Sequence, residues 1–168
     1  MTGGLAVEER YPPYQCLYGC CPHTVTAPIV AIVTANRNEL AEIRNTPFRK
    51  SIEAERVMAE SMKDLGFLHS VTNRKHPGLF KEGLNFEVDF FHPDQNTAVE
   101  VEKGEINNIW KNVCKFAESP LIRHGILLVP VIRKGQQTEN EFYQNTIKRL
   151  CHMEKVFSLL DSVVIIGY

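Results

Sequence analysis

The sequence lacks any apolar run of about 18 residues or more, which is the length that a membrane-spanning helix needs, so it predicts no membrane contact. A basic segment followed by a long apolar core is also missing near the first residues, so we expect no secretory signal and a cytoplasmic location. Internal repeats, low-complexity tracts and linker-like stretches are absent as well. We therefore expect a single domain over residues 1–168.

An excess of charge of either sign is missing too. The chain contains 19 Lys and Arg residues against 20 Asp and Glu residues, which leaves a formal net charge of −1. This balance argues against a protein that coats nucleic acid without regard to its sequence. It leaves open a local basic patch on one surface.

Cysteine is scarce and odd in number, with five residues, of which Cys16, Cys20 and Cys21 lie close together near His23. The simpler interpretation is that these are reduced thiols of a cytosolic protein. The alternative is a zinc site that uses Cys16, either Cys20 or Cys21, and His23. That site needs a fourth ligand, and the spacing matches no standard zinc pattern.

The most informative stretch is LNFEVDFFHPDQNTAVEVEKG, residues 84–104. Two runs that alternate with period two flank the turn-forming segment HPDQN, a pattern that predicts a hairpin of two antiparallel strands. In the first run the two expected faces are Phe86, Val88 and Phe90 against Glu87, Asp89 and Phe91. In the second run they are Val99 and Val101 against Ala98, Glu100 and Glu102.

Pairing of these strands would bring three or four carboxylates to one side of a small sheet. Like charges held close together repel, so the arrangement is costly unless a cation lies among them. Oxygen ligands suit a hard divalent ion such as Mg²⁺ or Mn²⁺. We expect Asp89 and Glu100 to bind the metal and Glu102, further along the same face, to hold or deprotonate an attacking water. The alternative is an ordinary solvent-facing side of a hairpin.

Local patterns predict the remaining elements. Before the hairpin we expect an irregular arm over residues 1–27, a strand over 28–34, a short helix over 36–45, a helix from Thr46–Pro47 to Leu65 that Gly66 ends, and a basic loop over 67–83. After the hairpin we expect a helix over 105–118, a strand over 125–132, a long helix from the capping box Thr138–Glu141 to about Leu160, and a strand over 162–167. Helices between consecutive strands imply parallel crossovers, so the sheet is expected to be mixed.

The order of acidic strand, acidic partner strand, amphipathic helix and buried strand resembles the PD-(D/E)xK nuclease superfamily. In that family an acid on one strand and a (D/E)-x-K triplet on the next surround one or two magnesium ions. Asp89 matches the first acid and Glu100 the second, but the third position is Glu102 instead of lysine. Lys103 is adjacent, yet on a regular strand it should point to the opposite face.

A Glu-x-Glu variant is similar to the BglII/BamHI-like branch of the type II restriction endonucleases. The run VEVEKG at 99–104, the helix with Trp110 and Phe116, and GILLVP at 125–130 carry this resemblance, which covers residues 47–135. It implies an α/β fold with a restriction-endonuclease-like core, in which helices flank a mixed central sheet, and a single nuclease-like domain.

The resemblance also implies a metal-dependent endodeoxyribonuclease that acts as a homodimer on double-stranded DNA, with Mg²⁺ as cofactor and Mn²⁺ as its substitute. The candidate DNA contacts are Arg74, Lys75, Lys81, Lys111 and Lys115. The candidate accessory residues at the metal are Glu53, Glu55 and Lys103. Because the usual lysine is missing, a catalytically inactive DNA-binding relative of the same fold stays open, as does a zinc-stabilised interaction protein.

Overall fold

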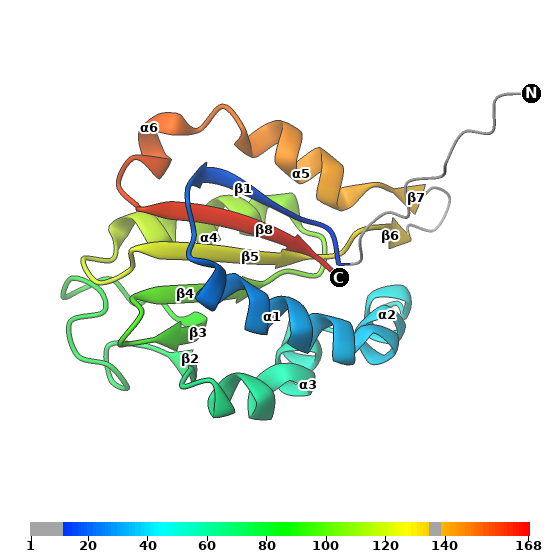
Figure 1. Cartoon of the computed structure of the whole chain (residues 1–168), viewed down its shortest axis with the longest axis horizontal. Coiled ribbons are helices and arrows are strands. Elements are labelled where there is room, and N and C mark those ends of the chain that lie inside the picture. Colours follow the sequence, from blue (N-terminus) through cyan, green and yellow to red (C-terminus); the bar gives the residue numbers. More distant parts are fainter. Residues whose placement is uncertain (1–11, 135–138) are drawn as a thin grey trace, which may run out of the picture.

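The computed structural model describes residues 12–134 and 139–168. A six-stranded sheet runs through the middle of the molecule, with helices on both faces (Figure 1). Its strands lie in the order β1 (Tyr14–Gly19), β8 (Ser162–Gly167), β5 (His124–Val129), β4 (Thr97–Val101), β3 (Val88–His92) and β2 (Leu68–Val71). Neighbours β4, β5 and β8 are parallel, and the other pairs are antiparallel. The predicted α/β fold with a mixed central sheet is confirmed.

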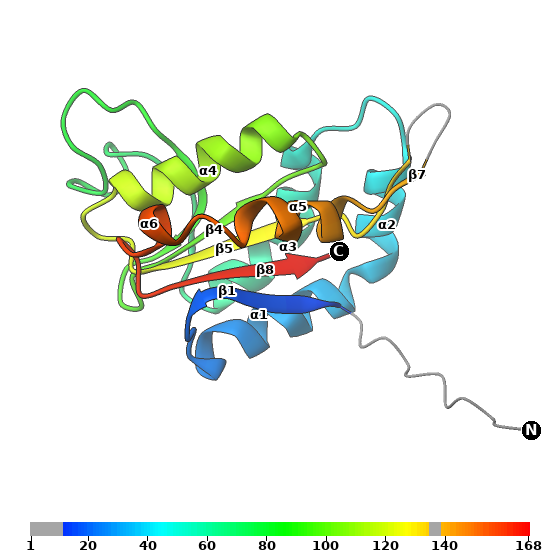
Figure 2. The same cartoon turned by 90° about the horizontal axis from the view of Figure 1, so that it is seen from above.

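Two layers of helices cover the sheet (Figure 2). One layer consists of α1 (His23–Ala35), α2 (Arg37–Asn45) and α3 (Ser51–Asp64), and the other of α4 (Ile106–Glu118), α5 (Phe142–Leu150) and α6 (Glu154–Phe157). Strand β5 shows why both layers are needed: Ile126 and Leu128 pack against the first layer, whereas Leu127 and Val129 pack against the second. This central strand is therefore buried on both faces, as its unbroken apolar run predicted.

The second helical layer supplies the connections between the parallel strands. Helix α4 joins β4 to β5, and the segment that holds α5 and α6 joins β5 to β8. That segment also contains the small ribbon of β6 (Arg133–Lys134) and β7 (Glu139–Asn140). The predicted helix over 105–118 and the predicted strand over 162–167 are confirmed, and α2 confirms the short helix over 36–45.

The N-terminal part differs from its prediction. Residues 1–11 lie outside the described residues, but β1 and α1 occupy much of the arm that was expected to be irregular, and α1 also replaces the strand expected over 28–34. Buried Val25, Ile29, Ile32 and Val33 recur at helical spacing on the sheet side of α1. Their burial offsets the loss of one backbone hydrogen bond at Pro28, which lies inside the helix.

Three other boundaries also differ. Helix α3 begins at Ser51 and not at Thr46–Pro47, because the Glu53 carboxylate accepts the Lys50 N–H at 2.9 Å and caps it there. The segment expected to be a basic loop contains edge strand β2. The long helix expected to reach Leu160 is two helices, α5 and α6, and Thr138 of its capping box lies outside the described residues. Within the described ranges, no helix has the length and apolarity to cross a bilayer.

Candidate active site

The predicted hairpin is confirmed, and it places the acidic side chains beneath α4. Strand β3 pairs with β4 at Phe90–Val99, Phe91–Ala98 and His92–Thr97. Because β4 also pairs with β5 on its other side, it is an internal strand and not an exposed edge. Ala98 packs on the α4 side of the sheet, so Glu100, two residues further, faces the same side.

The prediction that Phe86, Val88 and Phe90 share one face of the hairpin is wrong in one respect. Phe90 packs against the α1–α3 layer, but Phe86 and Val88 belong to the cluster under α4. The reason is that the backbone pairing of β3 with β4 stops at Phe90. At the preceding residue, the Asp89 side chain replaces the backbone as the hydrogen-bond acceptor: its Oδ2 accepts the Val101 N–H at 2.6 Å.

Asp89 and Glu100 line one pocket, and their negative charges act on each other. Glu100 is only 2% exposed, and Asp89 is half-buried. Burial raises the pKa of Asp89 to about 6, although the Val101 amide opposes the shift. Burial and then the charge of Asp89 raise the pKa of Glu100 well above its ordinary value. The alternative of a solvent-facing polar strand is therefore wrong for Glu100.

A lysine from α4 completes this pair. The Lys115 Nζ donates to both oxygens of Glu100, at 2.9 and 3.1 Å. Its side chain is 20% exposed, so the contact is largely sheltered from solvent. The sequence suggested Lys115 as a DNA contact, but the structure places it beside the second acid. A positive charge thus stands next to Glu100 although the strand carries no lysine at position 102.

Glu102 does not converge with the pair in the same way. Its Oε1 accepts the backbone N–H groups of Lys103, Gly104 and Glu105 at 2.8, 3.2 and 3.1 Å. Burial raises the pKa of this carboxyl group, and the Glu105 amide and the Asn108 side chain oppose the shift. The carboxylate therefore ties down the loop at the start of α4. Such an occupied oxygen is poorly placed to take a proton from water.

Lys103 points away from the acid pair, as expected for its place on the strand. Its Nζ donates to the carbonyl of Thr46 at 2.9 Å and to that of Arg49. These two carbonyls belong to the loop before α3, on the other side of the sheet. Lys103 thus fastens that loop to the end of β4, and the structure does not bring it to the acids.

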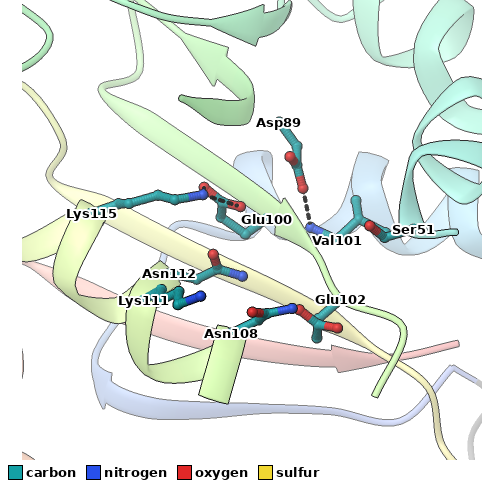
Figure 3. A pocket seen from close by; sticks show the side chains of 9 residues that line it. All are labelled: Ser51, Asp89, Glu100, Val101, Glu102, Asn108, Lys111, Asn112 and Lys115. Atoms are coloured by element: carbon teal, nitrogen blue, oxygen red, sulfur yellow. Dashed lines mark hydrogen bonds and ion pairs between the residues drawn. The ribbon is translucent and has the colours of Figure 1, made fainter. Parts of the chain in front are cut away.

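Asp89 and Glu100 line a pocket of about 190 Å³ that lies between strands β3 and β4 on one side and helix α4 on the other, with the first residue of α3 at its edge (Figure 3). The lining residues are Ser51, Asp89, Glu100, Val101, Glu102, Asn108, Lys111, Asn112 and Lys115. Acids line the strand side and amides and lysines line the helix side, so a group that carries both a metal ion and negative oxygens would be matched on both sides.

The two candidate accessory glutamates of α3, Glu53 and Glu55, differ in their burial and in their partners. Glu55 is 5% exposed, and burial together with the charges of Asp89 and Glu87 raises its pKa to about 8. Its Oε2 lies 3.4 Å from the His69 ring nitrogen Nε2. Glu53 instead bonds to Arg49 at 2.6 Å and caps its own helix, so it is not directed to the acids.

Among the predicted DNA contacts, the structure brings Lys111 and Lys115 to the pocket and leaves the others away from it. Arg74 and Lys81 are exposed in the segment between β2 and β3. Lys75 is also exposed, and its Nζ donates to the His69 carbonyl at 2.5 Å. Sequence reasoning missed Asn108 and Asn112, although their helical spacing from the two pocket lysines is a signal that could have identified them.

The cysteines near the N-terminus show no metal-like arrangement. The Cys16 thiol donates to the Tyr18 and Gly19 carbonyls at 3.1 Å, and Cys20 and His23 are exposed. Cys21 is half-buried, and burial raises the pKa of its thiol. Across residues 12–134 and 139–168, no three or more His, Cys, Asp or Glu side chains gather so as to hold a metal ion. The zinc hypothesis thus gains no support, and the acid site offers two carboxylates and not three.

The sequence matches no curated protein and no solved structure. It does match a family model over residues 5–168, a span that takes in both acidic strands, α4 and the pocket between them. This match agrees with the restriction-endonuclease resemblance of the acidic hairpin, without distinguishing a branch such as the BglII/BamHI-like one. Because the match covers nearly the whole sequence, the chain belongs to the restriction endonuclease family described as "Putative halobacteria restriction endonuclease".

Proposed function

We propose that the protein is a metal-dependent endodeoxyribonuclease that hydrolyses phosphodiester bonds in double-stranded DNA. The observation that carries this proposal is the pair of half-buried Asp89 and buried Glu100, with Lys115 bound to Glu100, at the wall of an open pocket. Burying two adjacent carboxylates is unfavourable, and ordinary packing gives no reason to do so. Perturbed carboxyl groups in a pocket are typical of functional sites.

The donor set fits the ion that the family implies. Mg²⁺ commonly takes one or two protein carboxylates and fills its other positions with water and phosphate oxygens. Asp89 and Glu100 supply two such groups, and Mn²⁺ has the same preference for oxygen. When bound, the ion supplies charge neutralisation for the phosphodiester and a more acidic water.

The chain's own residues have separate tasks in this proposal. The Val101 amide donates to Oδ2 of Asp89 and thereby holds this carboxylate at the wall of the pocket. Lys115 provides the positive charge that the strand lacks and that opposes negative charge growing on the phosphate. Glu102, which the sequence suggested as the base, instead holds the loop from which α4 starts.

The assembly on DNA is also part of the proposal. A homodimer is expected because two cuts in a duplex require two sites. Arg74, Lys75 and Lys81 lie exposed in one segment before the hairpin, where they can meet phosphates without adding sequence information. Each contributes modestly on its own, because exposed charges are screened by salt.

Cleavage of plasmid DNA with and without Mg²⁺ tests the function. We expect Asp89→Ala and Glu100→Ala each to lower the cleavage rate by at least about 100-fold, because each removes one of the two carboxylates that hold the ion. Glu87→Ala is the matched control: Glu87 is an exposed acid close in sequence to Asp89, and it should keep the wild-type rate. Circular dichroism of each variant checks that the fold is kept.

Full activity in either site variant would refute the assignment of that residue. A wild-type protein that binds duplex DNA but never cuts it, with Mg²⁺ or Mn²⁺, would favour the inactive relative. The observation behind that second candidate is that Glu102 occupies the lysine position of the strand and is already bound by loop amides.

A further inference from the structure

Helix α4 presents a polar stripe to the pocket. Asn108, Lys111, Asn112 and Lys115 recur at intervals of three and four residues, so they line one side of the helix. Beside this stripe runs the apolar one, in which Ile109, Val113 and Phe116 are fully buried. The packing of the apolar stripe therefore holds the polar stripe at the rim of the core, beside the pocket.

Two members of the stripe already have partners. Lys115 is bound to Glu100, and Asn108 lies at the Glu102 carboxylate, whose pKa it lowers. Figure 3 shows the other two, Asn112 and Lys111, in the space between these contacts. They are the members whose bonding capacity is left over for a ligand.

Asn112 is the more telling of the two. It is 5% exposed, yet its amide has no hydrogen-bond partner within the part of the chain that the structure describes. No buried side-chain nitrogen or oxygen of the described residues lacks a hydrogen-bond partner, so the polar atoms of the Asn112 amide are accessible from the pocket that Asn112 lines. The small exposed area that it keeps borders the pocket (Figure 3), from which a ligand can reach it.

Lys111 lies one residue before Asn112 and borders the same pocket. It is exposed and makes no ion pair with any described residue. A neutral donor and a cation thus approach the pocket from the helix side, opposite the two carboxylates. Two donors without a fixed acceptor suit an anion with several oxygens, which phosphate provides.

We propose that Asn112 and Lys111 form a phosphate-binding site for the nucleic-acid backbone, beside the acid pair. The Asn112 amide donates to a non-bridging phosphate oxygen, and Lys111 neutralises the charge. This inference rests on the proposed nuclease function; it adds Asn112, which the sequence did not suggest, and gives Lys111, already a candidate DNA contact, a specific partner residue and ligand group. Both are positioning residues, because they hold the backbone and do not touch the bond that breaks.

Duplex binding in chelator-containing buffer tests the site without any cleavage. The probe is a fluorescein-labelled duplex of random sequence, followed by anisotropy at several salt concentrations. The test variants are Asn112→Leu, which keeps the branching and the number of heavy atoms of the side chain but removes the donor, and Lys111→Ala. The controls are Asn107→Leu on the exposed side of the same helix and Lys148→Ala on α5.

We expect Asn112→Leu to weaken binding about tenfold, because a hydrogen bond to a charged oxygen is lost. Its melting temperature should stay level, since the Asn112 amide makes no hydrogen bond to a described residue that the substitution would remove. Lys111→Ala should weaken binding and reduce the slope of log Kd against log salt by about one. The controls should bind like the wild type.

Two results would overturn the inference while the proposed function stands. One is cleavage-competent wild-type protein whose Asn112→Leu and Lys111→Ala variants bind DNA as the controls do. The other is a fall in melting temperature of Asn112→Leu with unchanged binding, which assigns Asn112 a purely structural role. If Asn112→Leu fails to fold, the salt slope of Lys111→Ala decides alone. Wild-type protein that neither binds nor cuts duplex DNA would instead overturn the proposed function, and this site with it.

Discussion

The side chain of Glu55 is buried in the folded protein. Burial, Asp89 and Glu87 raise its pKa from 4.5 to about 8. Between these values the folded protein binds a proton that the unfolded chain has released, so stability falls as the pH rises. The slope for one such group is about 1.4 kcal/mol per pH unit at most. Asp89 and Glu100, whose pKa values are also raised, act in the same direction.

Urea unfolding of metal-free protein between pH 5 and 8 measures this effect, with the pH limits set by the shift to about 8. We expect Glu55→Gln to be more stable than wild type at the upper end, and its stability to depend less on pH. The exposed Glu60 on the same helix gives the control Glu60→Gln, which should follow the wild type. Parallel curves for wild type and Glu55→Gln would show that Glu55 ionises normally in the fold.

At this scale the sequence predicts part of the site. The proximity of Asp89 and Glu100 follows from alternation on two strands around a turn, which is local information. The pairing of Lys115 with Glu100 does not, because it depends on how far α4 is rotated over β4, and that is set by the packing of its apolar stripe. Nor does the sequence reveal that loop amides engage Glu102.

At the scale of one element, α4 depends on the carboxylate that precedes it. Three backbone N–H groups, at the start of α4 and in the loop before it, donate hydrogen bonds to Glu102 Oε1. Glu102→Ala leaves these donors without their charged acceptor, so we expect a loss of about 1–3 kcal/mol in the free energy of unfolding. Cleavage should fall as well, because α4 carries Lys115.

Urea denaturation and the plasmid assay together test the role of Glu102. Glu118→Ala is the matched control, since Glu118 lies exposed in the last turn of the same helix, where a negative charge is not favoured. It should be neutral or slightly stabilising. If Glu102→Ala were as stable as Glu118→Ala but inactive, a direct chemical role for Glu102 would return.

The elements themselves were predictable where one signal dominated. Helix α4 has one apolar stripe, and β5 has one unbroken apolar run, so pattern and packing agree. Helix α1 carried two conflicting signals. Its β-branched residues and Pro28 favoured a strand, whereas Val25, Ile29, Ile32 and Val33 recur at helical spacing. Burial against the sheet decided for the helix, because tertiary packing outweighs local propensity.

For the whole molecule, the proposed function implies that a cation bound at the acid pair would stabilise the fold by offsetting the repulsion between Asp89 and Glu100. A ligand that binds only the folded state raises its stability, by about 2.7 kcal/mol at a concentration one hundred times the Kd. For a chain of 168 residues this corresponds to a rise in Tm of about 5–10 °C. We therefore expect Mg²⁺ to raise the Tm of the wild type and to leave that of Glu100→Ala nearly unchanged.

Thermal scans with added Mg²⁺ and with chelator check this without any DNA. Glu87→Ala serves again as the control and should keep the shift. An equal shift in the wild type and in Glu100→Ala would mean that the ion binds elsewhere. A wild-type Tm that does not respond to Mg²⁺ or Mn²⁺ would argue against a metal held by the protein alone.

The mixed sheet was predictable from the order of strands and helices, but the position of β1 was not. Nothing local to residues 14–19 identifies a partner among residues 162–167, because such pairing depends on the sheet already built between them. Long-range pairing of this kind is the part of a fold that single-sequence patterns describe least.

The pairing of β1 with β8 has a consequence for folding during translation. Gly19 lies opposite Ser162, so β1 must wait for a partner strand that is synthesised about 140 residues later. At about 5–20 residues per second, that wait is on the order of ten seconds. Until then β5 has an unpaired edge on the side where β8 will bind, and an exposed strand edge of this kind is a binding site for chaperones.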